Sequence, residues 1–209
     1  SASGSSASAS STALAQAERS ACSSGRGARS GTTPRRASPT SLPVRDASAV
    51  YPLPMSGDGW SGTFLLEGQT YATGDPLPHA EYARALPGYF RAMRIPLLAG
   101  RDFTRDDRRG APQVVIVDDA LARRYWPNAP AVGKRVNVTG NPGDYATVVG
   151  VVGHVRNGGP QDEGEPQIYE PFLQRAQPTL SIVLHGEGDP SALVTAARAR
   201  VRALDAELP

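Results

Sequence analysis

The stretch VVIVDDALARRYWPNAPAVGKRV, from Val114 to Val136, decides the fold of this 209-residue chain. It begins with four aliphatic residues, three of them valines, which favour a buried strand. Asp118 stands where the N-cap of a helix belongs, and Asp119 adds negative charge at the helix's positive end. Pro127 ends the helix, and a glycine turn leads into a short second strand. The stretch therefore predicts a strand–helix–strand unit.

The helix of this unit carries one apolar stripe, which is typical of a helix that packs on a sheet. The adjacent carboxylates Asp118 and Asp119 also allow a catalytic reading. We prefer a structural one, because capping and the helix dipole explain both residues. The stripe consists of Val117, Leu121 and Tyr125, with Ala122 and Trp126 beside them.

The charge of the chain is unevenly distributed. Residues 1–46 hold six arginines against two acidic side chains, a net charge of +4, whereas residues 47–209 carry a net charge of −2. A nucleic-acid-binding domain needs basic charge clustered on a folded face, so we expect no nucleic-acid partner. The single cysteine, Cys22, excludes an intramolecular disulfide and a cysteine metal site.

Membrane segments are not expected within the chain. Its longest apolar runs, Val114–Val117 and Val148–Val152, are far shorter than the roughly 20 residues that span a bilayer. No positively charged start leads into an apolar segment, so no signal peptide is predicted.

Residues 1–46 are rich in Ser, Ala, Gly, Pro and Arg, and they predict a mostly disordered, low-complexity arm. Within it, Thr12 to Ser20 could form a short helix. The arginines could meet anionic lipid or RNA, but a solvated arm is the preferred interpretation.

The remaining chain alternates short strands with helices. Between the arm and the central unit, strands are predicted at SAVY (48–51), GTFLLEG (62–68) and HAEYARAL (79–86), and a short helix at YFRAM (89–93). In the charged loop that follows, Asp102, Asp106 and Asp107 do not have the spacing of a calcium loop. Four neighbouring arginines would neutralise them, so we predict a self-paired loop.

After the central unit, strands are predicted at AVGKRVNV (131–138), ATVVGVVGHVRN (146–157), QIYEPF (167–172) and LSIVLHG (180–186). Gly150 and Gly153 suit a bulge or a close approach of two backbones. The run GVVGHVRNGG lacks the spacing of a phosphate-binding loop and is interpreted as a strand and an exposed loop. Asp189-Pro190 then begins a final helix, whose apolar face carries Leu193, Ala197, Val201 and Leu204.

No catalytic pattern is visible. His79, His154 and His185 lie in unrelated contexts, and we expect ordinary polar positions rather than metal or catalytic sites. The aromatic residues Tyr51, Trp60, Phe64 and Tyr71 could line a ligand groove, but covering a small core is the preferred role. No enzyme activity and no cofactor are therefore predicted.

Five segments together resemble a known family. PGYFRAMRIPLLAGRDF (87–103), PQVVIVDDALARRYWP with VGKRV (112–136), TVVGVVGHVRN (147–157), PQIYEPF (166–172) and DPSALVTAARARVRALD (189–205) resemble the MacB-type periplasmic core domain of MacB/FtsX-class ABC transporter permeases. The similarity looks closest to the acidobacterial-type subgroup. It covers residues 47–209 in consistent order.

The resemblance carries a set of positions with structural roles. These are Tyr89, Phe90, Gly100, Arg101, Phe103, Val115, Leu121, Ala122, Tyr125, Trp126, Pro127, Gly133, Val149, Gly150, Val151, Tyr169 and Pro171.

The resemblance also implies an α+β architecture in two lobes. A porter-like lobe would comprise about residues 48–86 plus 179–209, and a strand-rich inserted lobe about residues 87–172. Such a domain lies outside the cytoplasm, between membrane segments of a bacterial inner-membrane permease. It transmits motion driven by a cytoplasmic ABC ATPase, which binds the ATP, and it contacts substrate or an adaptor protein, in a dimeric transporter.

The chain departs from the family pattern at its N-terminal side. Family members carry a long helix before the strand at Ser48–Tyr51, and here the arm takes that place, with only Thr12–Ser20 resembling a remnant. Since both flanking membrane segments are absent, we expect a fragment of a longer permease. The alternative function is a free-standing periplasmic module that binds a ligand or peptide.

Overall fold

The computed structural model describes residues 44–157 and 164–204. Residues 1–43 of the predicted arm, with its helix at Thr12–Ser20, lie outside these residues, as do Gly158 and Gly159. Val44 to Asp46 were expected to belong to the disordered arm, but they form the beginning of the strand Val44–Tyr51. Two compact units divide the described part of the chain: Asp46–Val183 forms the larger unit, and the smaller unit contains Val44, Arg45 and the residues from Leu184 onward.

The elements follow one another closely along the chain. The helices are α2 (Tyr89–Ala92), α3 (Asp119–Tyr125) and α4 (Pro190–Leu204). The strands are β1 (Val44–Tyr51), β2 (Trp60–Thr63), β3 (Leu65–Leu66), β4 (His79–Ala85), β5 (Leu97–Gly100), β6 (Val114–Asp118), β7 (Arg135–Asn137), β8 (Ala146–Val152), β9 (Gln167–Pro171) and β10 (Ser181–Gly186).

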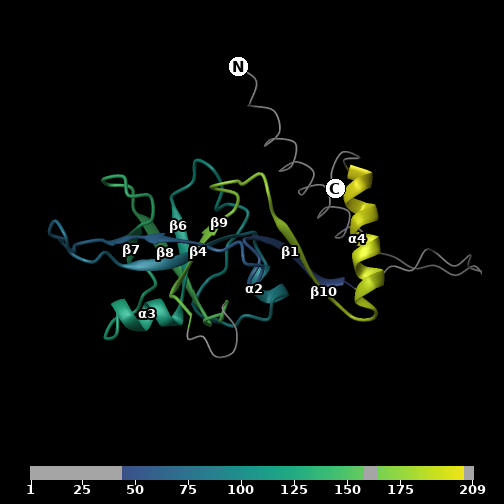
Figure 1. Ribbon diagram of the computed structural model, residues 1–209, viewed down its shortest axis with the longest axis horizontal. Coiled ribbons are helices and arrows are strands. Elements are labelled where there is room, and N and C mark those ends of the chain that lie inside the picture. Colours follow the sequence, from purple (N-terminus) through teal and green to yellow (C-terminus); the bar gives the residue numbers. More distant parts are fainter. Residues whose placement is uncertain (1–43, 158–163, 205–209) are drawn as a thin grey trace, which may run out of the picture. The chain divides into compact units, whose positions relative to one another are not determined.

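Strands β1 to β9 belong to one mixed sheet. Its main path runs β1-β4-β9-β6-β8-β7-β3, while β2 pairs with β4 and β5 pairs with β8. Figure 1 shows β4, β9, β6 and β8 side by side in the larger unit. The pairs β4–β9 and β6–β8 are parallel, whereas β6 and β9 are antiparallel. The predicted α+β class is confirmed.

Strand β6 lies in the centre of this sheet and is buried along its whole length. Side chains alternate between the two faces of a strand, so a strand covered on both faces needs apolar residues at successive positions. Val115 and Val117 belong to one core cluster, and Val114 and Ile116 belong to another. The four-residue aliphatic run is thus explained by burial on both faces.

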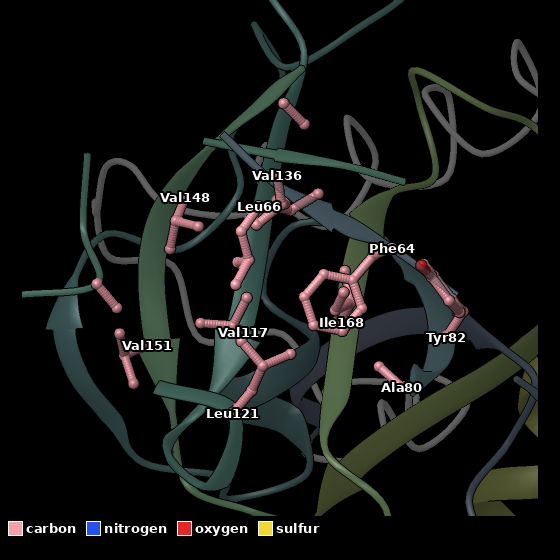
Figure 2. Packing of buried hydrophobic residues seen from close by; sticks show 13 residues of the cluster. Phe64, Leu66, Ala80, Tyr82, Val117, Leu121, Val136, Val148, Val151 and Ile168 are labelled. Carbon is pink, nitrogen blue, oxygen red and sulfur yellow. The ribbon is translucent and has the colours of Figure 1, made fainter. Parts of the chain in front are cut away.

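The first of these clusters packs α3 on the sheet. Figure 2 shows Phe64, Val117, Leu121 and Ile168 converging in it. Leu121 is fully buried, while Ala122, Tyr125 and Trp126 cover the edge of the cluster. The predicted apolar stripe of the helix is confirmed.

The second cluster contains the aromatic side chains around α2. Tyr89, Phe90, Phe103 and Tyr169 are all buried, and the Phe90 and Tyr169 rings meet edge to face with their centroids 4.9 Å apart. The short helix predicted over residues 89–93 is confirmed.

Strand β8 carries the irregularity that its glycines suggested. The register between β6 and β8 shifts between Val115 and Ile116, where Ile116 faces Gly150. A Cβ added at Gly150 would lie 2.4 Å from the carbonyl oxygen of Arg101, a backbone atom. Only a glycine fits this approach.

One predicted strand is divided in the structure. GTFLLEG was expected to form a single strand, but β2 ends at Thr63 and pairs with β4, whereas β3 begins at Leu65 and pairs with β7. Between them Phe64 is buried, and its N–H donates to the carbonyl of Pro78. The expectation was wrong because the chain changes its pairing partner at this residue.

The final helix begins as predicted, since the Asp189 carboxylate accepts a hydrogen bond from the N–H of Ser191. Of the helices in the described ranges, none combines the length and the apolar character needed to cross a bilayer. The division into a porter-like and an inserted lobe stays a prediction. Strand β4 of the first proposed lobe and β9 of the second are neighbours in one sheet.

Candidate functional site

A fully buried carboxylate lies where β6 passes into α3. Asp118 is 0% exposed, and its backbone is extended, with φ −80° and ψ 167°. Its Oδ1 accepts the N–H of Leu121 at 2.8 Å, which is the hydrogen bond of a helix N-cap. The predicted capping role of Asp118 is confirmed.

Asp118 has a second partner, the imidazole of His154. The ring Nδ1 lies 2.5 Å from Oδ2 of Asp118, and the His154 side chain is 13% exposed. The backbone N–H of His154 also donates to Oδ1 of Asp119 at 3.0 Å. Two neighbouring acidic residues of one strand–helix junction therefore hold the segment that leaves β8.

Polar side chains from β4 and β9 continue this arrangement. Gln167 donates from Nε2 to the carbonyl of Val155 at 2.7 Å and to Glu81 at 3.4 Å, and its Oε1 accepts the hydroxyl of Tyr169 at 2.8 Å. Asn157 donates to the same carboxylate of Glu81. We call Glu81, Asp118, His154, Asn157, Gln167 and Tyr169 the polar cluster.

Burial dominates the electrostatics of the polar cluster. It raises the pKa of the Asp118 carboxyl, although hydrogen bonds from the N–H of Leu121, from His154 and from the N–H of Gln167 act in the opposite direction. Burial also raises the pKa of Tyr169 well above its ordinary value, and Tyr89 and the nearby carboxylates add to this effect. Tyr169 is thus a neutral hydrogen-bond donor.

The polar cluster is suited to holding elements together rather than to chemistry on a substrate. Asp118 has no exposed surface through which a substrate could reach it. On the outer side of the imidazole, a Cβ added at Gly164 would lie 2.7 Å from Nε2, so the backbone of Gly164 packs close to the ring. Within residues 44–157 and 164–204, no group of three His, Cys, Asp or Glu side chains could hold a metal ion.

A second network of charged groups joins β4 and β9 elsewhere on the sheet. The buried carboxylate of Glu170 lies 3.1 Å from Nε of Arg84 and 3.2 Å from Nη1 of Arg175. The Arg84 guanidinium also lies over the ring of Trp60, 4.6 Å from its centroid. Through these contacts Glu170 cross-links β9 to Arg84 of β4 and to Arg175.

The four aromatic residues considered for a ligand groove do not come together as one. Phe64 is buried and meets Tyr125 edge to face, and the hydroxyl of Tyr71 accepts the N–H of Leu66. Only Tyr51 and Trp60 are adjacent, with their ring centroids 6.3 Å apart. The preferred role, covering a core, agrees with the placement of Phe64 in one core cluster and of Trp60 against it.

The charged loop after β5 was expected to be paired with itself, and this holds for Asp107. Arg101 donates from both Nη atoms to the two carboxylate oxygens of Asp107, at 2.7 and 2.8 Å. Burial raises the pKa of the Asp107 carboxyl, but hydrogen bonds from Arg101 and Thr104 outweigh it, so the pKa lies below its ordinary value. Asp102 instead accepts the N–H groups of Gly88 and Phe103.

The positions carried by the resemblance fall mainly in the core of the larger unit. Most are buried or lie at turns that bound the buried strands. Tyr89, Phe90, Phe103, Val115, Leu121, Gly150, Val151, Tyr169 and Pro171 are buried, Ala122, Tyr125, Trp126 and Val149 are half-buried, and Gly100, Arg101, Pro127 and Gly133 are exposed. Their structural role in the family stays a prediction.

The pair of Asp118 and His154 is the feature that sequence reasoning missed. The three histidines were expected to be ordinary polar positions, and capping was taken to explain both acidic residues. A signal was present, because Asp118 ends β6 and His154 follows β8, and neighbouring parallel strands place their carboxyl ends at one edge of a sheet. This signal predicts the contact only when β6 and β8 are already known to be neighbouring strands.

Comparisons with known proteins agree with the fold. The model of the family described as MacB-like periplasmic core domain matches residues 4–204. The periplasmic region of MacB from Actinobacillus actinomycetemcomitans aligns over 79% of this chain and 69% of its own, with a TM-score of 0.52 and 16% identity. The extracellular domain of the noncanonic ABC-type transporter YknZ from Gram-positive bacteria aligns over 78% of this chain and 75% of its own, with a TM-score of 0.49 and 19% identity. A comparison with curated proteins gives no significant match.

Proposed function

The chain belongs to the family of MacB-like periplasmic core domains, and from this we propose that it transmits ATP-driven motion in an ABC export permease and contacts substrate or partner proteins. It is an extracytoplasmic domain of a permease of this class in a bacterial inner membrane. The ATP is bound and hydrolysed by a cytoplasmic ATPase. An adaptor protein and a dimeric transporter are further parts of the proposal.

The observation that supports this function is the central sheet, whose strands β6 and β9 are buried along their whole length. Cores of this kind are densely packed and transmit strain instead of absorbing it. Strands β4, β9, β6 and β8 have fully buried side chains at Ala80, Ile168, Ile116 and Val148. A body of this kind can carry a displacement from one end to the other without deforming.

Side-chain cross-links reinforce the same strands. Glu170 ties β9 to Arg84 of β4, and Asp118 ties the end of β6 to His154 after β8. Because charged groups that are buried and paired are costly to separate, these contacts favour a single arrangement of the strands. We expect no catalysis, since the carboxylates concerned are used within the fold.

The experiment follows the domain in the complete permease reconstituted with its ATPase. Cys22 is replaced by serine, and a spin label is attached to a cysteine that replaces Val132, which is 36% exposed. A second label is placed in a membrane segment. We expect the distance between the labels to change when ATP is added, and not to change in a permease whose ATPase is inactive.

An unchanged distance in the presence of ATP would contradict the proposal. The gene sequence distinguishes the proposed permease domain from the alternative, a free-standing module. A reading frame that continues beyond Pro209 into a hydrophobic segment of about 20 residues supports the permease. A stop codon at that place supports the module.

A further inference from the structure

An exposed edge of the sheet is the strongest feature that the core of the fold does not account for. Every residue of β5 is exposed, whereas no residue of its neighbour β8 is. Leu97 is 43% exposed and Leu98 is 54% exposed. Among the strands of the described residues, only β8 pairs with β5, so no strand in that part of the chain covers the other edge of β5.

The backbone of Leu97 faces this open edge. Leu97 lies opposite Val152, and the N–H of Gly153 donates to the carbonyl of Pro96 at 2.9 Å. A bond between the residues that flank an antiparallel pair identifies the pair as non-hydrogen-bonded, in which both members direct their own N–H and C=O groups away from each other. The N–H and C=O of Leu97 therefore point away from β8, towards the side on which a further strand would pair.

Edge strands usually carry features that block pairing with another chain, and β5 has only some of them. Pro96 precedes it, and its register with β8 shifts between Leu97 and Ala99. Protected edges also carry charged side chains, whereas β5 has two exposed leucines. A third aliphatic side chain extends this surface, because a Cβ added at Gly100 would lie 3.0 Å from Cγ2 of Val132, which is 36% exposed. The edge is thus apolar and suits a short partner strand.

The chain around β5 is basic, although the domain as a whole is acidic. Residues 91–109 hold six arginines and three aspartates, a net charge of +3, whereas the rest of residues 47–209 holds ten basic and fifteen acidic side chains, a net charge of −5. Because like charges repel across an interface, a second copy of this basic edge is a poor partner, and an acidic partner fits it.

Two of these arginines lie at the ends of the strand. Arg94 comes shortly before β5, Arg101 directly follows it, and both are exposed. Arg101 pairs with Asp107, but its side chain remains 46% exposed. A strand that approaches the open edge therefore meets positive charge at both of its ends.

A lipid surface satisfies this edge less well than a peptide does. Inserting β5 into a bilayer would leave the N–H and C=O of Leu97 without partners in a medium that lacks water, which is costly. A strand of another protein would pair with both groups and would cover the leucines at the same time.

We propose that β5 is a docking edge for an extended segment of a partner protein, with apolar residues in its middle and acidic residues at its ends. The segment pairs with β5 as an additional strand, its apolar side chains cover Leu97 and Leu98, and its carboxylates meet Arg94 and Arg101. The inference specifies the partner contact of the proposed function and rests on that part of it alone, because binding at this edge requires no ATP-driven motion.

Nuclear magnetic resonance of the complete 209-residue chain tests the docking edge with the synthetic peptide Glu-Val-Thr-Val-Thr-Val-Glu. We expect saturable shifts of the amide resonances of Leu97–Gly100 and slower exchange of the N–H of Leu97, since that group gains a hydrogen bond. The titration contains no ATPase, so its result is independent of the distance change measured in the complete permease.

Two altered peptides separate strand pairing from charge. A peptide with methylated backbone nitrogens cannot form the ladder and should not shift the resonances of β5. A peptide with lysine in place of both glutamates should bind at least about fivefold more weakly, because one exposed ion pair contributes up to about fivefold in affinity. Equal binding of either altered peptide would overturn the proposal.

Two variants of the chain locate the contact. Leu98→Glu places a negative charge on the edge and should weaken binding by about fivefold or more. Val194→Glu is the matched control, because Val194 is 49% exposed and lies in α4, and it should leave binding unchanged.

Several results would overturn the docking edge. These are the absence of shifts in β5 with the first peptide, and equal affinities of the two variants. Shifts of the same resonances with phosphatidylglycerol vesicles but not with the peptide would assign the edge to a membrane surface instead. Shifts that grow with the concentration of the chain alone would assign it to a second copy.

Discussion

At the scale of single residues, Gly150 lies where two backbones approach each other closely. A Cβ at this position would lie 2.4 Å from the carbonyl oxygen of Arg101 and 3.3 Å from Cγ1 of Ile116. Backbone atoms cannot yield as a flexible side chain can, so Gly150→Ala should lower the free energy of unfolding by about 1–3 kcal/mol or more. Urea denaturation measures this loss.

The matched control for this substitution is Gly59→Ala. Nothing lies within 4 Å of a Cβ at Gly59, and its backbone does not require glycine. We expect its unfolding midpoint to stay close to that of the wild type. Equal midpoints for both variants would show that the contact at Gly150 is not restrictive.

A second prediction concerns Ile168, which is 0% exposed in β9 between β4 and β6. Ile168→Ala removes buried atoms and leaves a cavity, and we expect a loss of about 2–5 kcal/mol. Ile182 is 47% exposed, so Ile182→Ala should cost much less. Guanidinium titrations of the two variants give the comparison, and similar losses would place Ile168 outside the core.

At the scale of elements, the loop between β5 and β6 owes its order to Asp107. Its pKa lies below the ordinary value, so the ion pair with Arg101 contributes stability above the pKa of an unfolded aspartate, roughly 4. This contribution is lost as the pH falls through the lowered pKa. Asp107→Asn should therefore destabilise the chain near neutral pH and lose less stability on acidification.

Thermal unfolding at several pH values measures this difference. Asp106→Asn is the matched control, because Asp106 is exposed and lies next to Asp107. The explanation fails if the two variants show the same melting temperatures throughout. The pKa shifts of Asp107 and Asp118 have opposite signs: the pKa of Asp107 is lowered, and that of Asp118 is raised.

The elements that the sequence predicts best are those with local causes. The aliphatic run at Val114–Val117, the cap at Asp118 and the stop at Pro127 depend on residues within one short segment, and the structure contains the strand and the helix they predict. The Asp189 cap of α4 is of the same kind. Local hydrogen bonds and periodicity suffice for such elements.

Features that depend on distant partners were not accessible in this way. The contact of Asp118 with His154 joins positions 36 residues apart, and it exists because β6 and β8 are parallel neighbours. The interruption at Phe64 likewise arises because β2 and β3 pair with different strands. Neither pairing can be read from the spacing of apolar residues, which specifies faces but not neighbours.

At the scale of the whole molecule, the larger unit contains both core clusters. Every residue of these clusters lies between Val50 and Val183. A domain with its own cores is expected to fold alone, so a chain of residues 46–183 should unfold cooperatively and give dispersed amide resonances. Calorimetry and nuclear magnetic resonance measure these properties.

A shorter chain provides the control for this prediction. Residues 46–164 lack β9, which lies between β4 and β6, and their sheet would be divided. We expect this chain to remain unfolded or to aggregate. Cooperative unfolding of the shorter chain, or its absence in the longer one, would mean that the sheet is not the unit of stability.

The position of β9 also governs when the domain can fold during its biogenesis. Arg84 in β4 and Glu170 in β9 are 86 residues apart in sequence, and the central place between β4 and β6 stays empty until the later segment has been delivered. Until then both neighbours present unpaired backbone edges, which invite aggregation, and pairing over such a separation is slow. A domain arriving on the far side of a membrane would thus complete its sheet late, so the interval before β9 emerges is when a holding chaperone would matter most.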